Sequence, residues 1–88
     1  MRLLVVEDEK KLCDMIAKSL HQSGYEVDVC NDGEEALDMI YAEMYDLIVL
    51  DLNLPGVDGM EILRELRKED EETKVLILSL IHISEPTR

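Results

Sequence analysis

The chain has 88 residues, a length that favours a single domain or part of one. Its 9 basic and 21 acidic residues give a formal net charge of −12, which argues against nucleic acid or an anionic membrane surface as a partner of this segment. Apolar residues make up 47% of the chain but aromatic residues only 3%, so the core must consist of aliphatic side chains. Such a core is typical of layered α/β domains.

The two cysteines, Cys13 and Cys30, show neither a CxxC spacing nor the pattern of a disulfide framework. We therefore expect free thiols in a reducing compartment, the cytoplasm. Residues 1–2 lead directly into a short apolar run with no secretory segment, and the longest apolar run, residues 75–83, is too short to span a bilayer. We therefore expect no attachment to a membrane.

The first half of the chain predicts two strands and two helices in alternation. Residues 2–6 read as a buried strand, and residues 9–23 carry apolar side chains at helical spacing. Residues 25–30 alternate between apolar and acidic side chains, which suits a strand at the edge of a sheet. Residues 31–33 predict a turn that caps a helix over residues 34–43. The inward positions expected of the first helix are Leu12, Met15, Ile16 and Leu20.

The second half continues the alternation. Residues 46–50 contain an uninterrupted apolar run, which predicts a fully buried strand, and the Pro-Gly and Asp-Gly pairs that follow predict a loop. Asp58 can cap a third helix, and residues 75–78 predict a fourth strand that ends at Ser79. The order β-α-β-α-β-α-β implies parallel strands joined by right-handed crossovers.

Acidic side chains end two of the buried strands. Glu7 and Asp8 follow the first strand, and Asp51 follows the third. Because ligands of open parallel sheets bind at the carboxyl ends of the strands, we expect these carboxylates to meet at one edge. Their mutual repulsion should raise at least one pKa, and a hard divalent cation with oxygen ligands would remove it. The sequence therefore predicts a Mg²⁺ site at this edge.

Residues 3–9 and 46–59 together resemble the receiver domain of bacterial two-component response regulators, of the winged-helix (OmpR/PhoB) subfamily. The resemblance rests on the acidic pair after the first strand and on a D-x-x-L-P-x-x-[DN]-G loop that runs from Asp51 to Gly59. It covers residues 1–79. It implies a doubly wound, flavodoxin-like parallel sheet whose four strands lie in the order 2-1-3-4.

The resemblance also implies roles for individual residues. Asp51 matches the aspartate that accepts a phosphoryl group from a sensor histidine kinase, and Asp8 and Glu7 match the acidic residues that bind Mg²⁺. Asn53 matches the position whose backbone carbonyl binds the metal, and Ser79 the hydroxyl that turns toward the phosphoryl group on activation. The chain would thus modify its own aspartate rather than act as a conventional enzyme. The parent protein would be a DNA-binding transcriptional regulator whose output domain is absent from this segment.

The last residues depart from the family. Residues 80–88 resemble no part of a receiver and look like translated vector or adapter sequence, so we expect a partial receiver over 1–79 and an artefactual tail. The family implies a further helix, a lysine-bearing fifth strand and a final helix, without which the fragment should signal poorly. The fourth strand would then expose an edge prone to self-association. The rival interpretation is a receiver-like module that binds a protein partner without being phosphorylated.

Overall fold

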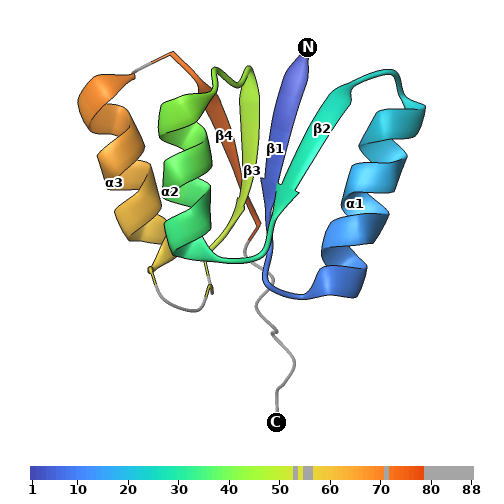
Figure 1. The fold of residues 1–88 in the computed structure, drawn as a ribbon, viewed down its shortest axis with the longest axis horizontal. Coiled ribbons are helices and arrows are strands. Elements are labelled where there is room, and N and C mark those ends of the chain that lie inside the picture. Colours follow the sequence, from blue (N-terminus) through green and yellow to red (C-terminus); the bar gives the residue numbers. More distant parts are fainter. Residues whose placement is uncertain (53, 55–56, 71, 79–88) are drawn as a thin grey trace, which may run out of the picture.

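The computed structural model of the protein describes residues 1–52, 54, 57–70 and 72–78. Four strands and three helices alternate along these residues. They form one parallel sheet with the strand order β2-β1-β3-β4. Figure 1 shows α2 and α3 on one side of this sheet and α1 on the other. The doubly wound fold and the strand order are therefore confirmed. The elements are β1 (Arg2–Val6), α1 (Lys10–Gln22), β2 (Glu26–Cys30), α2 (Gly33–Ala42), β3 (Leu47–Asp51), α3 (Gly59–Glu69) and β4 (Lys74–Leu78).

The two central strands, β1 and β3, separate two apolar layers, because successive side chains of a strand point to opposite faces of the sheet. Leu4 and Ile48 belong to the layer beneath α2 and α3, whereas Val5 and Val49 belong to the layer beneath α1. All four side chains are at most 4% exposed. Burial on both faces is the physical reason for the unbroken apolar runs in these two strands.

The orientation of α1 corrects one sequence-based expectation. Met15 was expected to face inward, but it is 67% exposed, whereas Cys13 is fully buried against Val5 and Val49. Ile16 packs against the same cluster three residues after Cys13, as helical periodicity requires, while Met15 lies outside that cluster. Met1, Met44 and Met60 are exposed as well, whereas Met39 packs against the core beneath α2 and α3.

The helix boundaries follow the capping residues that the sequence indicates. Asp32 accepts a hydrogen bond from the backbone N–H of Glu34 at 2.8 Å, and Asp58 accepts one from Met60 N–H at 3.2 Å. Each bond satisfies one of the N–H groups that a helix leaves without a partner in its first turn. Gly24, which follows the C-cap residue Ser23 of α1, adopts a φ of +100°, which an L side chain rarely tolerates.

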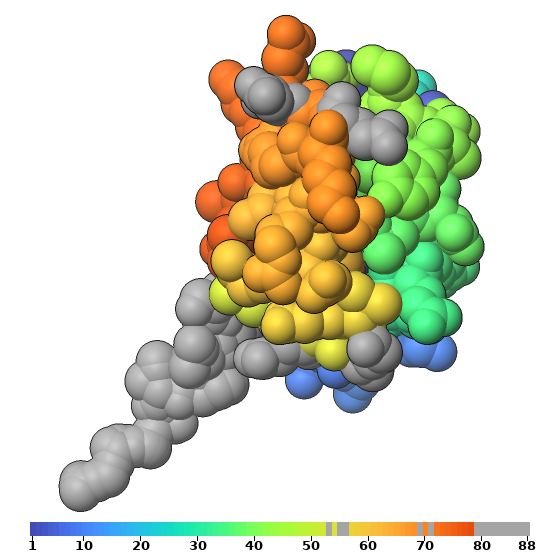
Figure 2. Space-filling view, turned by 90° about the vertical axis from the view of Figure 1, so that its left-hand side faces the viewer, coloured from blue at the N-terminus to red at the C-terminus, as the bar shows by residue number. Residues whose placement is uncertain are grey.

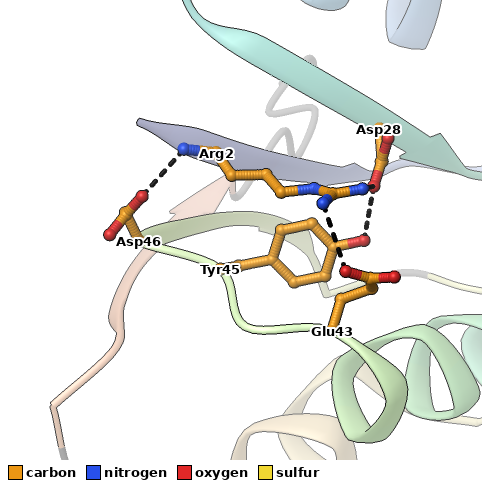
Figure 3. Close-up of polar contacts among 5 residues, drawn as sticks. All are labelled: Arg2, Asp28, Glu43, Tyr45 and Asp46. Atoms are coloured by element: carbon orange, nitrogen blue, oxygen red, sulfur yellow. Dashed lines mark hydrogen bonds and ion pairs between the residues drawn. The ribbon is translucent and has the colours of Figure 1, made fainter.

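A polar network centred on Arg2 ties the strands together at the amino-terminal end of the sheet (Figure 3). The guanidinium of Arg2 pairs with Asp28 and with Glu43, each at 3.1 Å, and lies 5.7 Å from the centre of the Tyr45 ring. Tyr45 donates its hydroxyl hydrogen to Asp28 at 2.7 Å. Asp46 accepts a hydrogen bond from the backbone N–H of Arg2 at 2.8 Å. This network joins β1, β2 and the entry to β3.

The thiols of Cys13 and Cys30 are free, as the sequence indicates, and the structure shows that both are buried. Burial raises the pKa of each thiol, that of Cys30 to about 11, so both are poor nucleophiles near neutral pH. Within the part of the chain that the structure describes, no helix is long and apolar enough to cross a membrane.

Candidate functional site

Three carboxylates meet at the carboxyl end of the sheet. Glu7 and Asp8 directly follow β1, and Asp51 is the last residue of β3, which pairs with β1 in parallel register. One oxygen atom of each carboxylate lies within 4.8 Å of the other two. The structure thus brings together the three acidic side chains that the sequence places at strand ends.

The three side chains differ in burial. Glu7 is 3% exposed and Asp51 is 4% exposed, whereas Asp8 lies open to solvent. The Oε2 atom of Glu7 accepts a hydrogen bond from the backbone N–H of Glu9 at 3.1 Å. Its Oε1 atom is also buried but accepts no hydrogen bond from any residue that the structure describes. A buried carboxylate oxygen without a partner is costly, and it is the kind of atom that a bound cation satisfies.

The electrostatics of the site appear most clearly at Glu7. Burial raises the pKa of Glu7 to about 7, the backbone N–H of Glu9 opposes this shift, and the negative charge of Asp51 adds to it. The sequence predicts a raised pKa from mutual repulsion among the carboxylates. The structure shows that loss of solvation is the larger cause and repulsion the smaller one.

Gly59 holds the start of α3 against the exit of β3. A Cβ atom at this position would lie 2.7 Å from the backbone oxygen of Asp51 and 2.7 Å from the Cα of Leu52. Contacts this short with backbone atoms cannot be relieved by moving a side chain, so only glycine allows this approach. The Asp-Gly pair of the loop motif therefore has a direct effect on the position of Asp51.

Asn31 supports the site, although the sequence alone indicates only that it belongs to a turn. Its side-chain Nδ2 donates a hydrogen bond to the backbone oxygen of Glu7 at 2.8 Å, and the backbone N–H of Glu7 donates to Cys30 oxygen at 3.0 Å. The end of β2 thereby fixes the backbone that carries Glu7. The sequence carries one signal for this role: Asn31 directly follows β2, which ends at the same edge of the sheet as β1 and β3.

Two predicted site residues, Asn53 and Ser79, lie outside the described residues, as do Pro55 and the segment 80–88. The described donor set consists of three carboxylates, two on a buried floor and one on an exposed rim. Mg²⁺ prefers oxygen ligands and retains several waters, so a half-open site of this kind suits it. The unpartnered Oε1 atom of Glu7 supports the same fit.

The chain matches the family of response regulator receiver domains over residues 3–88. It therefore belongs to this family, and the resemblance seen in the sequence is confirmed. It is 44% identical over 79 residues to the transcriptional regulatory protein TctD of Salmonella typhimurium, and the aligned region covers 90% of this chain and 35% of TctD. The chain thus spans about a third of the length of this relative.

Solved structures show the same relationship. The response regulator protein TrrA from Thermotoga maritima, in complex with Mg²⁺ and BeF, matches with a TM-score of 0.87 and 37% identity, covering 92% of this chain and 70% of TrrA. TrrA in complex with the histidine kinase ThkA matches with a TM-score of 0.84 and 36% identity, covering 97% of this chain and 74% of the solved one. The fold and the family therefore agree with each other.

Proposed function

We propose that the chain accepts a phosphoryl group on Asp51 from a sensor histidine kinase, in a site that also binds Mg²⁺. The observation that carries the proposal is the convergence of Glu7, Asp8 and Asp51, with oxygen atoms within 4.8 Å of one another, at the carboxyl edge of a receiver fold. Glu7, Asp8, Asp51 and the backbone carbonyl of Asn53 are the proposed metal ligands. Ser79 is proposed as the hydroxyl that contacts the phosphoryl group.

The proposed step is a direct displacement at phosphorus. An oxygen atom of Asp51 forms the new bond to phosphorus, and the bond from phosphorus to the donor nitrogen or oxygen breaks, with its electron pair leaving on the donor. An ionised carboxylate needs no general base for this attack. When bound, Mg²⁺ supplies the positive charge that such a crowded anionic transition state requires. The product is an acyl phosphate on Asp51, which hydrolyses readily and so suits a reversible signal.

Intact-mass measurement after incubation with acetyl phosphate and Mg²⁺ tests the proposal. The wild-type chain should gain the mass of one phosphoryl group, and the gain should disappear in Asp51→Asn and in the presence of EDTA. Asp38→Asn is the matched control, because it removes the same charge from an exposed position on α2. Equal labelling of Asp51→Asn and wild type would refute the assignment of Asp51.

The rival interpretation, a module that binds partners without phosphorylation, is not favoured, because it gives no reason to bury Glu7 and Asp51 side by side. Metal titration separates the two interpretations. Binding of Mg²⁺ that vanishes in Asp51→Ala supports the phosphoacceptor, whereas no binding at any concentration supports the interaction module.

The wider setting is also part of the proposal. The structure of the relative TrrA with the kinase ThkA supports a histidine kinase as the partner of this chain. The name of TctD supports a parent protein that regulates transcription. The net charge of −12 argues against contact with DNA by this segment. Two free, buried thiols support a location in the cytoplasm.

A further inference from the structure

The turn between β2 and α2, residues 31–33, begins where the pairing of β1 with β2 ends. Val6 and Cys30 are the last register partners of the two strands, and the residue after β1, Glu7, donates its backbone N–H to the oxygen of Cys30 at 3.0 Å. In a regular parallel ladder, the neighbouring strand would continue with a backbone N–H directed at the oxygen of Glu7. Here the side-chain Nδ2 of Asn31 donates to that oxygen at 2.8 Å. The side chain of Asn31 thus adds one hydrogen bond to the ladder while the backbone of β2 turns away into α2.

Both backbone groups of Glu7 are therefore held by the end of β2. Asn31 contacts the peptide oxygen of Glu7 and not its carboxylate, so it acts on the carboxylate only through the backbone that carries it. The turn is itself held in place, because the Cys30 thiol donates to Asp32 oxygen at 3.0 Å and the Asp32 carboxylate caps α2. The direction of a side chain follows from the conformation of its backbone. The Asn31 contact therefore helps to fix where the buried Oε1 atom of Glu7 lies.

The same turn also meets the loop that follows Asp51. A Cβ atom at Gly33 would lie 2.7 Å from the backbone oxygen of Val57 and 2.9 Å from its Cβ atom, so the glycine lets the two segments touch. Val57 lies shortly before Gly59, which approaches the backbone of Asp51 in the same way. Figure 2 shows the start of α2, in green, beside the start of α3, in yellow, at the lower end of the molecule. Residues 31–33 thus contact the segments that follow both β1 and β3.

We propose that Asn31 is a positioning residue of the metal site, and that the turn of residues 31–33 holds Glu7 and Asp51 at the separation that binds Mg²⁺. The inference rests on the proposed function, because it concerns the metal affinity of that same site. Glu7 lies beyond the last residue of β1 that pairs with β3, so the sheet alone does not fix it relative to Asp51. The turn supplies the link, through Asn31 on one side and Gly33 on the other. Loss of an outer contact that orients a metal ligand weakens metal binding about tenfold or more.

Titration with Mg²⁺, followed by calorimetry, tests the role of Asn31. Asn31→Ala should raise the dissociation constant for Mg²⁺ about tenfold. Ser23→Ala is the matched control and should leave this constant unchanged, because it also removes a side-chain hydrogen bond to a backbone oxygen, that of Ser19, but at the far end of α1. Equal dissociation constants for wild type and Asn31→Ala would overturn the inference and leave the proposed function intact. A wild-type chain that binds no Mg²⁺ would overturn both.

Labelling with acetyl phosphate separates positioning from a purely structural role. If Asn31 positions the site, Asn31→Ala should need about ten times more Mg²⁺ for half-maximal labelling, and its rate at saturating Mg²⁺ should stay close to that of wild type. A residue that only stabilises the fold would instead lower the folded fraction, which reduces the maximal rate and leaves the Mg²⁺ requirement unchanged. That second pattern would refute the inference. Circular dichroism of each sample measures the folded fraction.

Gly33→Ala tests the contact with the loop that follows β3. Its Cβ atom would meet Val57 at 2.7 and 2.9 Å and push the loop away, so Mg²⁺ binding should weaken, in the same direction as for Asn31→Ala. Gly24→Ala, whose Cβ atom meets nothing within 4 Å, is the control for the loss of a glycine and should keep the wild-type affinity. An unchanged affinity in Gly33→Ala would refute the link between the turn and Asp51.

NMR of the wild-type chain tests the inference without any substitution. The side-chain amides of the chain belong to Gln22, Asn31 and Asn53, so their signals are few. Mg²⁺ should shift the Asn31 amide with the same midpoint as binding, because a cation held by the Glu7 carboxylate changes the residue to which this amide donates. Gln22, the last residue of α1, is the internal control and should not shift. An Asn31 amide that stays unchanged at saturating Mg²⁺ would overturn the inference.

Discussion

Glu7 and Asp51 place carboxylate oxygens within 4.8 Å of each other, although both side chains are at most 4% exposed. When two buried carboxylates at this distance are both ionised, they destabilise the folded state, because neither solvent nor distance weakens the repulsion between their charges. A cation bound by the two ionised carboxylates would offset this repulsion and so explain why they are placed together. The stability of the chain should therefore depend on pH and on Mg²⁺, and that dependence should originate at these residues.

The first prediction concerns pH. The pKa of Glu7 is raised from 4.5 to about 7 in the folded protein, so between these values the folded state holds a proton that the unfolded state has released. The contribution of Glu7 to stability should therefore fall as pH rises through this window, by about 3 kcal/mol. In EDTA, Glu7→Gln should lose less stability than wild type between pH 4 and pH 8, by about this amount. Urea unfolding at both pH values measures the difference.

The comparison between the two proteins isolates the contribution of Glu7. Asp70, for example, has a lowered pKa, with the side-chain hydrogen bond from Thr73 as the largest cause, so its own contribution changes only below its ordinary value of 3.8 and is the same in both proteins. Parallel stability curves for wild type and Glu7→Gln would show that Glu7 titrates normally. They would also remove the electrostatic reason for a cation at this site.

The second prediction concerns metal. A ligand that binds only the folded state stabilises it, and about a tenfold excess over the dissociation constant contributes about 1.4 kcal/mol. At pH 7.5, Mg²⁺ should therefore raise the melting temperature of the wild-type chain. Asp51→Asn should abolish this response, whereas Asp38→Asn on the exposed face of α2 should retain it. Scanning calorimetry with and without Mg²⁺ gives the result. An unchanged response in Asp51→Asn would place the metal elsewhere.

The third prediction separates the site from the fold by comparing two glycines. Gly59→Ala forces a Cβ to within 2.7 Å of the Asp51 backbone oxygen, so it should cost about 1–3 kcal/mol and weaken Mg²⁺ binding by displacing Asp51. Gly24→Ala meets no atom within 4 Å, but it strains a residue with a φ of +100°. It should cost about 1–2 kcal/mol and leave Mg²⁺ affinity unchanged. Chemical denaturation combined with metal titration of both variants compares the two effects.

The sequence predicts the elements of this fold well because their signals are local. The apolar runs of β1 and β3 and the capping residues Asp32 and Asp58 act within a few positions of the chain, and the structure confirms them. The predicted orientation of α1 was wrong at one position, Met15, for a physical reason. Cys13 is small and was treated as a thiol, but it packs like an apolar residue and turns Met15 outward.

The site was only partly predictable. Its acidic residues could be identified because each ends a buried strand, but the pairing of β1 with β3 is a long-range contact that the resemblance supplied. The backbone that carries Glu7 is held by Asn31, which lies 24 positions away and donates to the Glu7 backbone oxygen. The unpartnered Oε1 atom follows from that packing and has no signature in the sequence. Long-range contacts of this kind set the electrostatics of the site.

The last prediction concerns the opposite end of the sheet, where Tyr45 donates to Asp28 at 2.7 Å. This hydrogen bond is the largest cause of the lowered pKa of Asp28. The hydrogen bond and charge of Arg2 lower the pKa further, whereas burial of the carboxyl raises it. Tyr45→Phe should cost about 1.5–3 kcal/mol at pH 7, because a buried ring loses its bond to a charged acceptor. A lowered carboxyl pKa contributes stability above its ordinary value of 3.8, and this contribution is lost as the pH falls through the folded-state pKa. The difference between the two proteins should therefore shrink in acid.

Urea unfolding at pH 7 and pH 3 measures this effect, and NMR titration of the Asp28 carboxyl measures its pKa directly. Mg²⁺ binding provides the control, since Tyr45 lies just before β3 and Asp28 in the middle of β2, whereas the three carboxylates lie at the carboxyl end of the sheet. Tyr45→Phe should therefore lower stability without changing the affinity for Mg²⁺, the reverse of the pattern expected for Asp51→Asn. A variant whose pKa at Asp28 stays low would show that Arg2 alone holds that carboxylate ionised.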